Sequence, residues 1–183
     1  MATDLTGLTM KLDLLLHAEA AKTADFATVK APVTMAKVME FPFGADVGSH
    51  NQIWWDRRTL AASADDELDL TGDEAGEQLL NAFGVKVYFD SVRLVIVINR
   101  SDETIGAHAA SDAIISVGPG DGNDWLGPFQ ANTHRLNVLP GCPLILLSPA
   151  DIQTVSADDD VKITNEDGAA EALYDILIAG VSE

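Results

Sequence analysis

Hydrophobic and polar residues alternate near the start of this chain, and the alternation predicts a β-strand. In residues 8–16 every even position is apolar, beginning with Leu8, Met10 and Leu12. A period of two places these side chains on one face of an extended strand. A strand with one apolar face needs a partner surface, so this segment is either part of a core or an arm that contacts another subunit.

Residues 27–40 alternate in the same way and predict a second strand, in which Pro32 indicates an edge position or a bend. Residues 17–25 lie between the two strands and fit either a helical turn or a long loop. Residues 1–45 are therefore a candidate extended arm that carries the first strands.

The rest of the chain is a row of short apolar segments separated by turn residues. The pattern predicts strands near residues 51–62, 65–72, 85–90, 92–99, 113–117, 135–139, 144–147, 152–155, 161–164 and 174–179. One helix is predicted over residues 74–83, because Leu79, Leu80 and Phe83 follow a 3.6-residue period and Gly84 can end a helix. The predicted fold is all-β: one β-sandwich or jelly-roll-like domain over residues 1–183, with one short helix.

Charge narrows the range of partners. The 183 residues contain 11 Lys and Arg against 29 Asp and Glu, a formal net charge of -18. Nucleic acids and anionic membranes attract basic surfaces, so neither is expected as a partner. Apolar runs are too short to span a membrane, and the first residues lack a secretory signal pattern, which favours synthesis in the cytosol. The single cysteine, Cys142, precedes an apolar run and is expected to be buried.

No pattern of catalytic or cofactor-binding residues stands out. The four histidines do not have the spacing of metal ligands, and no Gly-x-Ser-x-Gly motif is present. The run that contains Asp121, Asn123 and Asp124 fits either a calcium site or a plain tight turn. Residues 158–160 are three aspartates, interpreted as the solvated start of a strand. We therefore expect no enzyme activity, no cofactor and no metal site.

The adjacent tryptophans Trp54 and Trp55 are the most informative residues. Neighbours on a strand point to opposite faces, so one indole should enter the core and the other should face outwards. Because Ile53 shares a face with Trp55, we predict that Trp55 is the core residue and Trp54 the contact residue. Arg57 and Arg58 follow at once, and both Trp and Arg are favoured at protein interfaces. The alternative is that the monomer covers both tryptophans.

A third tryptophan, Trp125, lies in the sequence Asp-Trp-Leu-Gly-Pro-Phe and is predicted to cap one end of the core.

Several short sequences occur here in an order that resembles a known family. They are IWWDRRTLAAS at 53–63, ELDLTG at 67–72, AFG at 82–84, the strand at 92–99, WLGPF at 125–129, VLPG at 138–141 and YDILIAG at 174–180. As an ordered set, which spans roughly residues 50–180, they resemble short β-rich structural proteins of tailed bacteriophages and prophages.

The resemblance implies a virion structural protein, of the head decoration or cement type, on the capsid surface. Its partners would be the major capsid protein and further copies of itself, as a homo-oligomer such as a trimer. The candidate interface residues are Trp54, Arg57, Arg58, Leu8, Met10 and Leu12. A carbohydrate-binding or receptor-binding β-sandwich is the alternative, since exposed tryptophans can stack on sugars.

Overall fold

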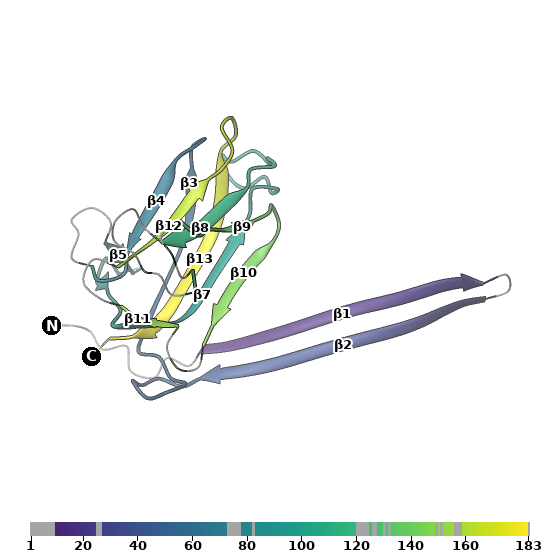
Figure 1. The fold of residues 1–183 in the computed structure, drawn as a ribbon, viewed down its shortest axis with the longest axis horizontal. Helices are drawn as coiled ribbons and strands as arrows, with labels where there is room; N and C mark the ends of the chain where they lie inside the picture. Colours follow the sequence, from purple (N-terminus) through teal and green to yellow (C-terminus); the bar gives the residue numbers. More distant parts are fainter. Residues whose placement is uncertain are drawn as a thin grey trace. The chain divides into compact units, whose positions relative to one another are not determined.

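A computed structural model of the protein describes residues 10–24, 27–72, 78–81, 83–119, 125, 128–129, 131, 133–148, 150, 152–155 and 159–182. Within these residues every regular element is a β-strand, so the predicted all-β class is confirmed (Figure 1). The chain divides into two compact units, Met1–Phe43 and Gly44–Glu183. The boundary lies two residues before the end of the predicted arm. No helix in the described part of the chain is long and apolar enough to cross a membrane.

The first unit is a long two-stranded hairpin. Strand β1 (Met10–Ala24) pairs antiparallel with β2 (Ala27–Phe41), from Met10 opposite Phe41 to Ala24 opposite Ala27. The predicted strands at 8–16 and 27–40 are confirmed as far as they are described, and Leu8 lies outside the described residues. Residues 17–24 continue the strand, so the expected helical turn or loop is wrong there. The alternation fades in this Ala-rich stretch, but cross-strand pairing keeps the backbone extended.

The second unit contains two antiparallel sheets. The first sheet runs in the order β10 (Pro143–Leu147), β7 (Ser91–Asn99), β13 (Ala172–Val181) and β3 (Gln52–Leu60), and β11 (Gln153–Thr154) also pairs with β7. The second sheet runs in the order β4 (Asp65–Asp69), β12 (Asp160–Asn165), β8 (Ile115–Pro119) and β9 (Leu136–Val138). Strands β5 (Leu79–Leu80) and β6 (Lys86–Val87) form a small separate pair.

The core lies between these two sheets, as expected for a β-sandwich. Alternate residues of each strand supply it, including Val95 and Val97 from β7, Ile163 from β12 and Ile115 from β8. Trp125 is fully buried in this cluster, with its ring 6.3 Å from that of Phe129 in an edge-to-face arrangement. Its predicted place in the core is confirmed.

The predicted helix at 74–83 is not found in the described part of that segment. Gln78 forms an isolated bridge with Asp69, and Leu79 and Leu80 form strand β5. Leu79 is fully buried whereas Leu80 is exposed, which is the alternation of a strand. The helical spacing of these apolar residues was misleading, because so few apolar residues cannot define a period. Residues 73–77 and 82 lie outside the described residues.

Buried polar side chains tie the two sheets together. The Asn99 amide, on β7, donates to the carbonyls of Ala113 and Val138 at 2.9 and 2.8 Å, beside the second sheet. The Asn165 amide, on β12, donates to the carbonyls at the end of β3 and to that of Ala170. Both asparagines are buried with their hydrogen bonds made, so these ties fix the relative position of the sheets at little desolvation cost.

A charged network closes one edge of the sandwich. Asp66 of β4 accepts two hydrogen bonds from Arg58 of β3, at 2.7 and 2.8 Å, and another from the hydroxyl of Tyr174 of β13. The Arg58 guanidinium lies 5.2 Å from the centre of the Trp54 ring, within cation–π range. Burial, together with the Asp66 charge, raises the pKa of Tyr174 well above its usual value. The tyrosine therefore acts as a neutral donor.

Removing the shared carboxylate should destabilise the fold. We expect Asp66→Ala to lower the free energy of unfolding by about 3 kcal/mol, because it leaves Arg58 and the Tyr174 hydroxyl without their common acceptor. Asp56→Ala, which removes the more exposed partner of Arg58, should cost about 1 kcal/mol or less. Urea unfolding of both variants measures the difference, and equal losses would contradict this account.

Candidate binding surface

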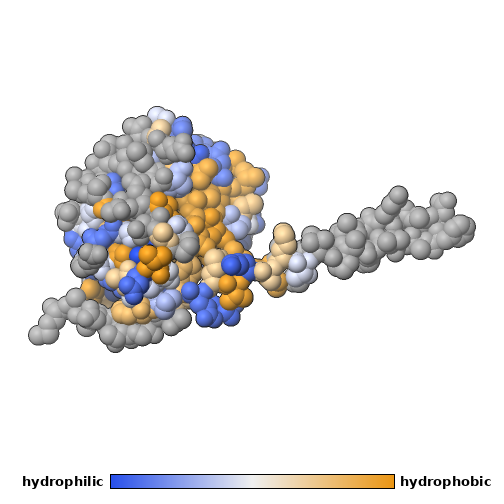
Figure 2. Space-filling model, turned by 60° about the horizontal axis from the view of Figure 1, so that its bottom comes forward, coloured by the Kyte–Doolittle hydropathy of each residue, from blue (hydrophilic) through white to orange (hydrophobic). Residues whose placement is uncertain are grey.

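The outward side of the first sheet is apolar across four of its five strands, β3, β13, β7 and β10. The β-pairing aligns Trp55 of β3 with Leu177 of β13, Leu177 with Ile96 of β7, and Ile96 with Ile145 of β10. Directly paired residues share a face, so these four side chains form a row on the side away from the core. We call this surface the outer face and include Ile98, which alternates with Ile96. In the view of Figure 2, hydrophobic side chains gather in a broad patch on the second unit.

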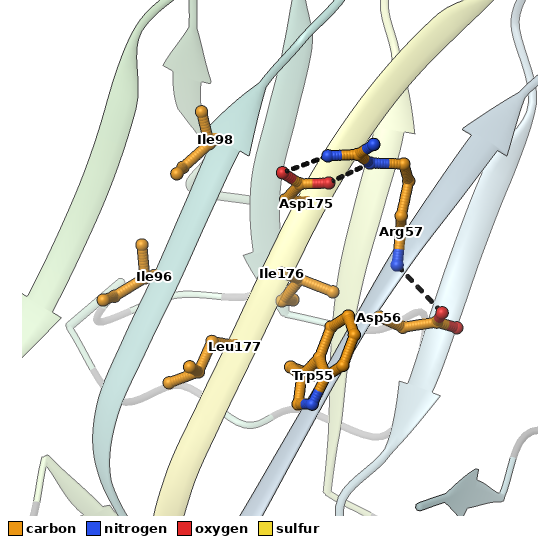
Figure 3. A pocket seen from close by; sticks show the side chains of 8 residues that line it. All are labelled: Trp55, Asp56, Arg57, Ile96, Ile98, Asp175, Ile176 and Leu177. Carbon is orange, nitrogen blue, oxygen red and sulfur yellow. Dashed lines mark hydrogen bonds and ion pairs between the residues drawn. The ribbon is translucent and has the colours of Figure 1, made fainter. Parts of the chain in front are cut away.

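A hollow of about 470 Å³ lies on this outer face. Trp55, Ile96, Ile98 and Leu177 form its apolar wall, with further lining from Asp56, Arg57, Asp175 and Ile176 (Figure 3). It is an open depression with a polar margin, of the kind that receives side chains of another molecule.

The polar margin is a paired group. Arg57 binds Asp175 through two hydrogen bonds, at 2.5 and 3.0 Å, and Arg100 adds a third at 3.1 Å. The hydrogen bond from Arg57, and then that from Arg100, hold the pKa of Asp175 below its ordinary value although burial opposes this. Asp175 is thus a carboxylate held by two guanidinium groups, which leaves little acidic character on the outer face.

The outward side of the second sheet is different in kind. Lys162 of β12 is nearly buried and contacts Asp65 at 2.6 Å and Glu67 at 3.4 Å. Gly118, opposite Lys162 on β8, is covered by Arg135, whose Cδ would lie only 2.4 Å from a Cβ placed there. Charged side chains therefore cover the described part of this face, in contrast to the apolar outer face of the first sheet.

The two tryptophans do point to opposite sides, but the predicted assignment is wrong. Trp54 is the core residue, 2% exposed, and its Nε1 donates to the Leu80 carbonyl at 3.1 Å. Trp55 is 69% exposed on the outer face. Ile53 does share a face with Trp55, but that face is the outer one. The prediction assumed that an apolar neighbour marks the core, which fails when both sides of a sheet are apolar.

The other candidate interface residues belong to different elements of the fold. Arg57 belongs to the margin of the outer face, whereas Arg58 faces the sandwich edge and binds Asp66. Met10 and Leu12 are half-buried on the hairpin. The signal that was missed is the long apolar run of β7, whose residues on both sides of the sheet are hydrophobic.

Several other residues that the sequence analysis singled out lie in surroundings different from those predicted. Cys142 is exposed, not buried as expected, because it lies in the turn before β10. Asp159 and Asp160 are buried, so they are not a solvated start of a strand. His108 is buried and contacts Glu171 at 3.2 Å, whereas Asp121, Asn123 and Asp124 lie outside the described residues. Among the side chains that the structure describes, no group of three or more His, Cys, Asp or Glu is placed to hold a metal ion.

Comparison with known proteins adds no relative. No protein family matches this sequence, and no curated protein matches it. The case for a function therefore depends on the sequence resemblance and on the surfaces described above.

The assignment of Trp54 to the core and Trp55 to the outer face can be tested directly. Trp54→Ala should lower the free energy of unfolding by roughly 3–5 kcal/mol, because it empties a large core site. Trp55→Ala should change it by about 0.5 kcal/mol or less, since that indole is mostly in solvent. Chemical denaturation of the two variants measures both values. A larger loss for Trp55→Ala would restore the original assignment.

The Arg57–Asp175 pair predicts a pH dependence. Because the folded protein lowers the pKa of Asp175, its stabilising effect is complete above the unfolded-state pKa of about 3.9 and is lost as the pH falls through the lower folded value. The difference in unfolding free energy between wild type and Asp175→Asn should therefore be constant near neutral pH and shrink below about pH 4. The same comparison in an Arg57→Gln background should show a weaker change. A difference independent of pH down to pH 2 would argue against the coupling.

Proposed function

We propose that this protein is a structural component of a virus particle, which decorates the capsid and stabilises the shell through protein–protein contacts. Its partners are the major capsid protein and further copies of itself. The proposal assigns the protein no enzyme activity and places it on the virion surface. Support comes from the resemblance to structural proteins of tailed phages and from the type of surface that the fold presents.

The apolar outer face is the observation that carries this proposal. A contiguous, partly exposed apolar patch that ends in an exposed Trp on the edge strand, with a paired Arg at its margin, is typical of a protein contact surface. The side chains stand on a sheet fixed by buried amide ties, so little order has to be gained on binding. Many such contacts on one shell add together, which suits a protein present in many copies.

The charge distribution supports a basic partner. Residues 44–183 contain seven Lys and Arg against 24 Asp and Glu. Arg57, Arg58 and Arg100 already pair with nearby carboxylates. They therefore cannot also neutralise the remaining Asp and Glu, and the second unit stays strongly acidic. A surface of this sign would be steered towards basic regions of a capsid, and this attraction weakens as salt is added.

Binding of carbohydrate is a second candidate, favoured by one specific observation. The exposed ring of Trp55 lies beside the Arg57–Asp175 pair, which offers donors and acceptors next to a flat apolar surface. A sugar ring stacked on the indole would find polar partners at the margin.

Binding to shells distinguishes the two candidates. We expect the purified protein to cosediment with capsids that lack it, to saturate at a fixed number of copies per shell, and to be released progressively as salt is raised. A glycan array should give no signal. Binding to glycans that is lost in Trp55→Ala, without binding to any shell, would favour the carbohydrate module and overturn the proposal.

A further inference from the structure

The hairpin carries an apolar surface of its own. The pairing of β1 with β2 sets Leu12 opposite Met39 and Leu14 opposite Lys37, so these side chains share one face of the ribbon with Met10 and Met35. We call this the arm face. Met35 is 59% exposed and Leu14 is 37% exposed. All four methionines of the chain lie in residues 1–43, and methionine is the side chain that adapts best to a varied contact surface.

A two-stranded ribbon has little stability by itself. An isolated pair of strands is marginally stable in water and normally needs a third strand or a packed face. This ribbon has fifteen pairs, so each strand reaches about 50 Å. Within the first unit the described residues form only these two strands. The ribbon therefore needs an apolar surface against which the arm face can pack.

Charge shows which surface the arm can approach. Residues 1–43 contain four Lys against five Asp and Glu, so this unit is nearly neutral, whereas residues 44–183 carry almost all of the excess negative charge. Two acidic units repel each other, but a nearly neutral ribbon with several lysines can approach either without that penalty. The outer face is also the part of the acidic unit where Asp175 is neutralised by Arg57 and Arg100.

From these observations we infer that the arm face of one copy packs on the outer face of a second copy. Each copy then donates one apolar ribbon and receives another, so both apolar surfaces are buried by a single type of contact. The ribbon forms a third layer over the first sheet, as in ordinary packing of one sheet on another. Trp55, the most exposed side chain of the outer face, is the main aromatic anchor of this contact. The contact is between copies and does not depend on the shell that they join.

Disulfide trapping tests the contact directly. In a Cys142→Ser background, Leu12, Leu14 or Met35 is changed to Cys in one preparation, and Leu177→Cys is introduced in a second preparation that carries a tag. After mixing under mild oxidation, we expect crosslinked pairs that contain one chain of each kind. Val38→Cys is the matched control, since Val38 is 54% exposed but lies opposite Asp13 on the other face of the same ribbon.

Self-association of full-length variants gives an independent readout. Trp55→Glu and Met35→Glu should each weaken the association measured by analytical ultracentrifugation by roughly thirtyfold, as for an interface residue that carries much of the binding energy. Phe83→Glu and Val38→Glu, which alter exposed apolar residues elsewhere, should leave it nearly unchanged. Circular dichroism checks that every variant keeps its strands.

Three results would overturn the inference. One is a wild-type protein that is monomeric at all concentrations, and another is crosslinking that is as efficient from Val38→Cys as from the arm-face positions. The third is a chain with both cysteines, Met35→Cys and Leu177→Cys, that closes only an internal disulfide, which would mean that the arm covers its own sheet. Because no shell is present in these experiments, each result leaves the capsid-binding test of the proposed function untouched.

Discussion

The structure depends on the pairing of β7 with β13, two strands that are apolar on both sides. Val95 and Val97 face the core, while Ile96 and Ile98, which alternate with them along the strand, face outwards. Because the side chains of a strand alternate strictly, no change of register can bury both sets against one partner sheet. Strands of this kind are normally covered on both faces. The second sheet supplies one cover, and within the second unit the described residues leave Trp55 on the other side of the first sheet largely exposed.

The second sheet also has an outward side, but its side chains there are polar. Its outward side chains are charged, and Lys162 is held between carboxylates while Arg135 lies over Gly118. The sandwich is thus polarised, with one side suited to water and the other suited to contact. The buried amides of Asn99 and Asn165 fix the sheets together, so the apolar side is formed in advance. Advance formation reduces the ordering cost of any partner that binds there.

Local patterns predicted the strands well and the surface poorly. Alternation and turn residues located β1, β2, β7 and β13, because the period of a strand and the residues that end it can be seen locally in the sequence. The outer face depends instead on pairing between Trp55 and Leu177, which are far apart in the chain and carry no mutual signal in a single sequence. The tryptophan assignment failed for a related reason: Ile53 marked an apolar side of β3, but that side was not the core. The predicted helix failed because Leu79 and Leu80 lie on opposite sides of a strand, one buried and one exposed, and so short an apolar segment does not define a period.

The uneven charge also restricts how copies of this protein can meet. At physiological ionic strength charges act over about 8 Å, so the mean repulsion between two acidic units matters mainly when their surfaces touch. The electrostatic cost of contact between two copies is then set by the charges within the two surfaces that touch. The carboxylates of the second unit outnumber its Lys and Arg side chains. On the outer face, however, the charge of Asp175 is matched by Arg57 and Arg100. The apolar face is therefore also a place where contact brings few unpaired charges together, and hydrophobic burial there is opposed by little electrostatic cost.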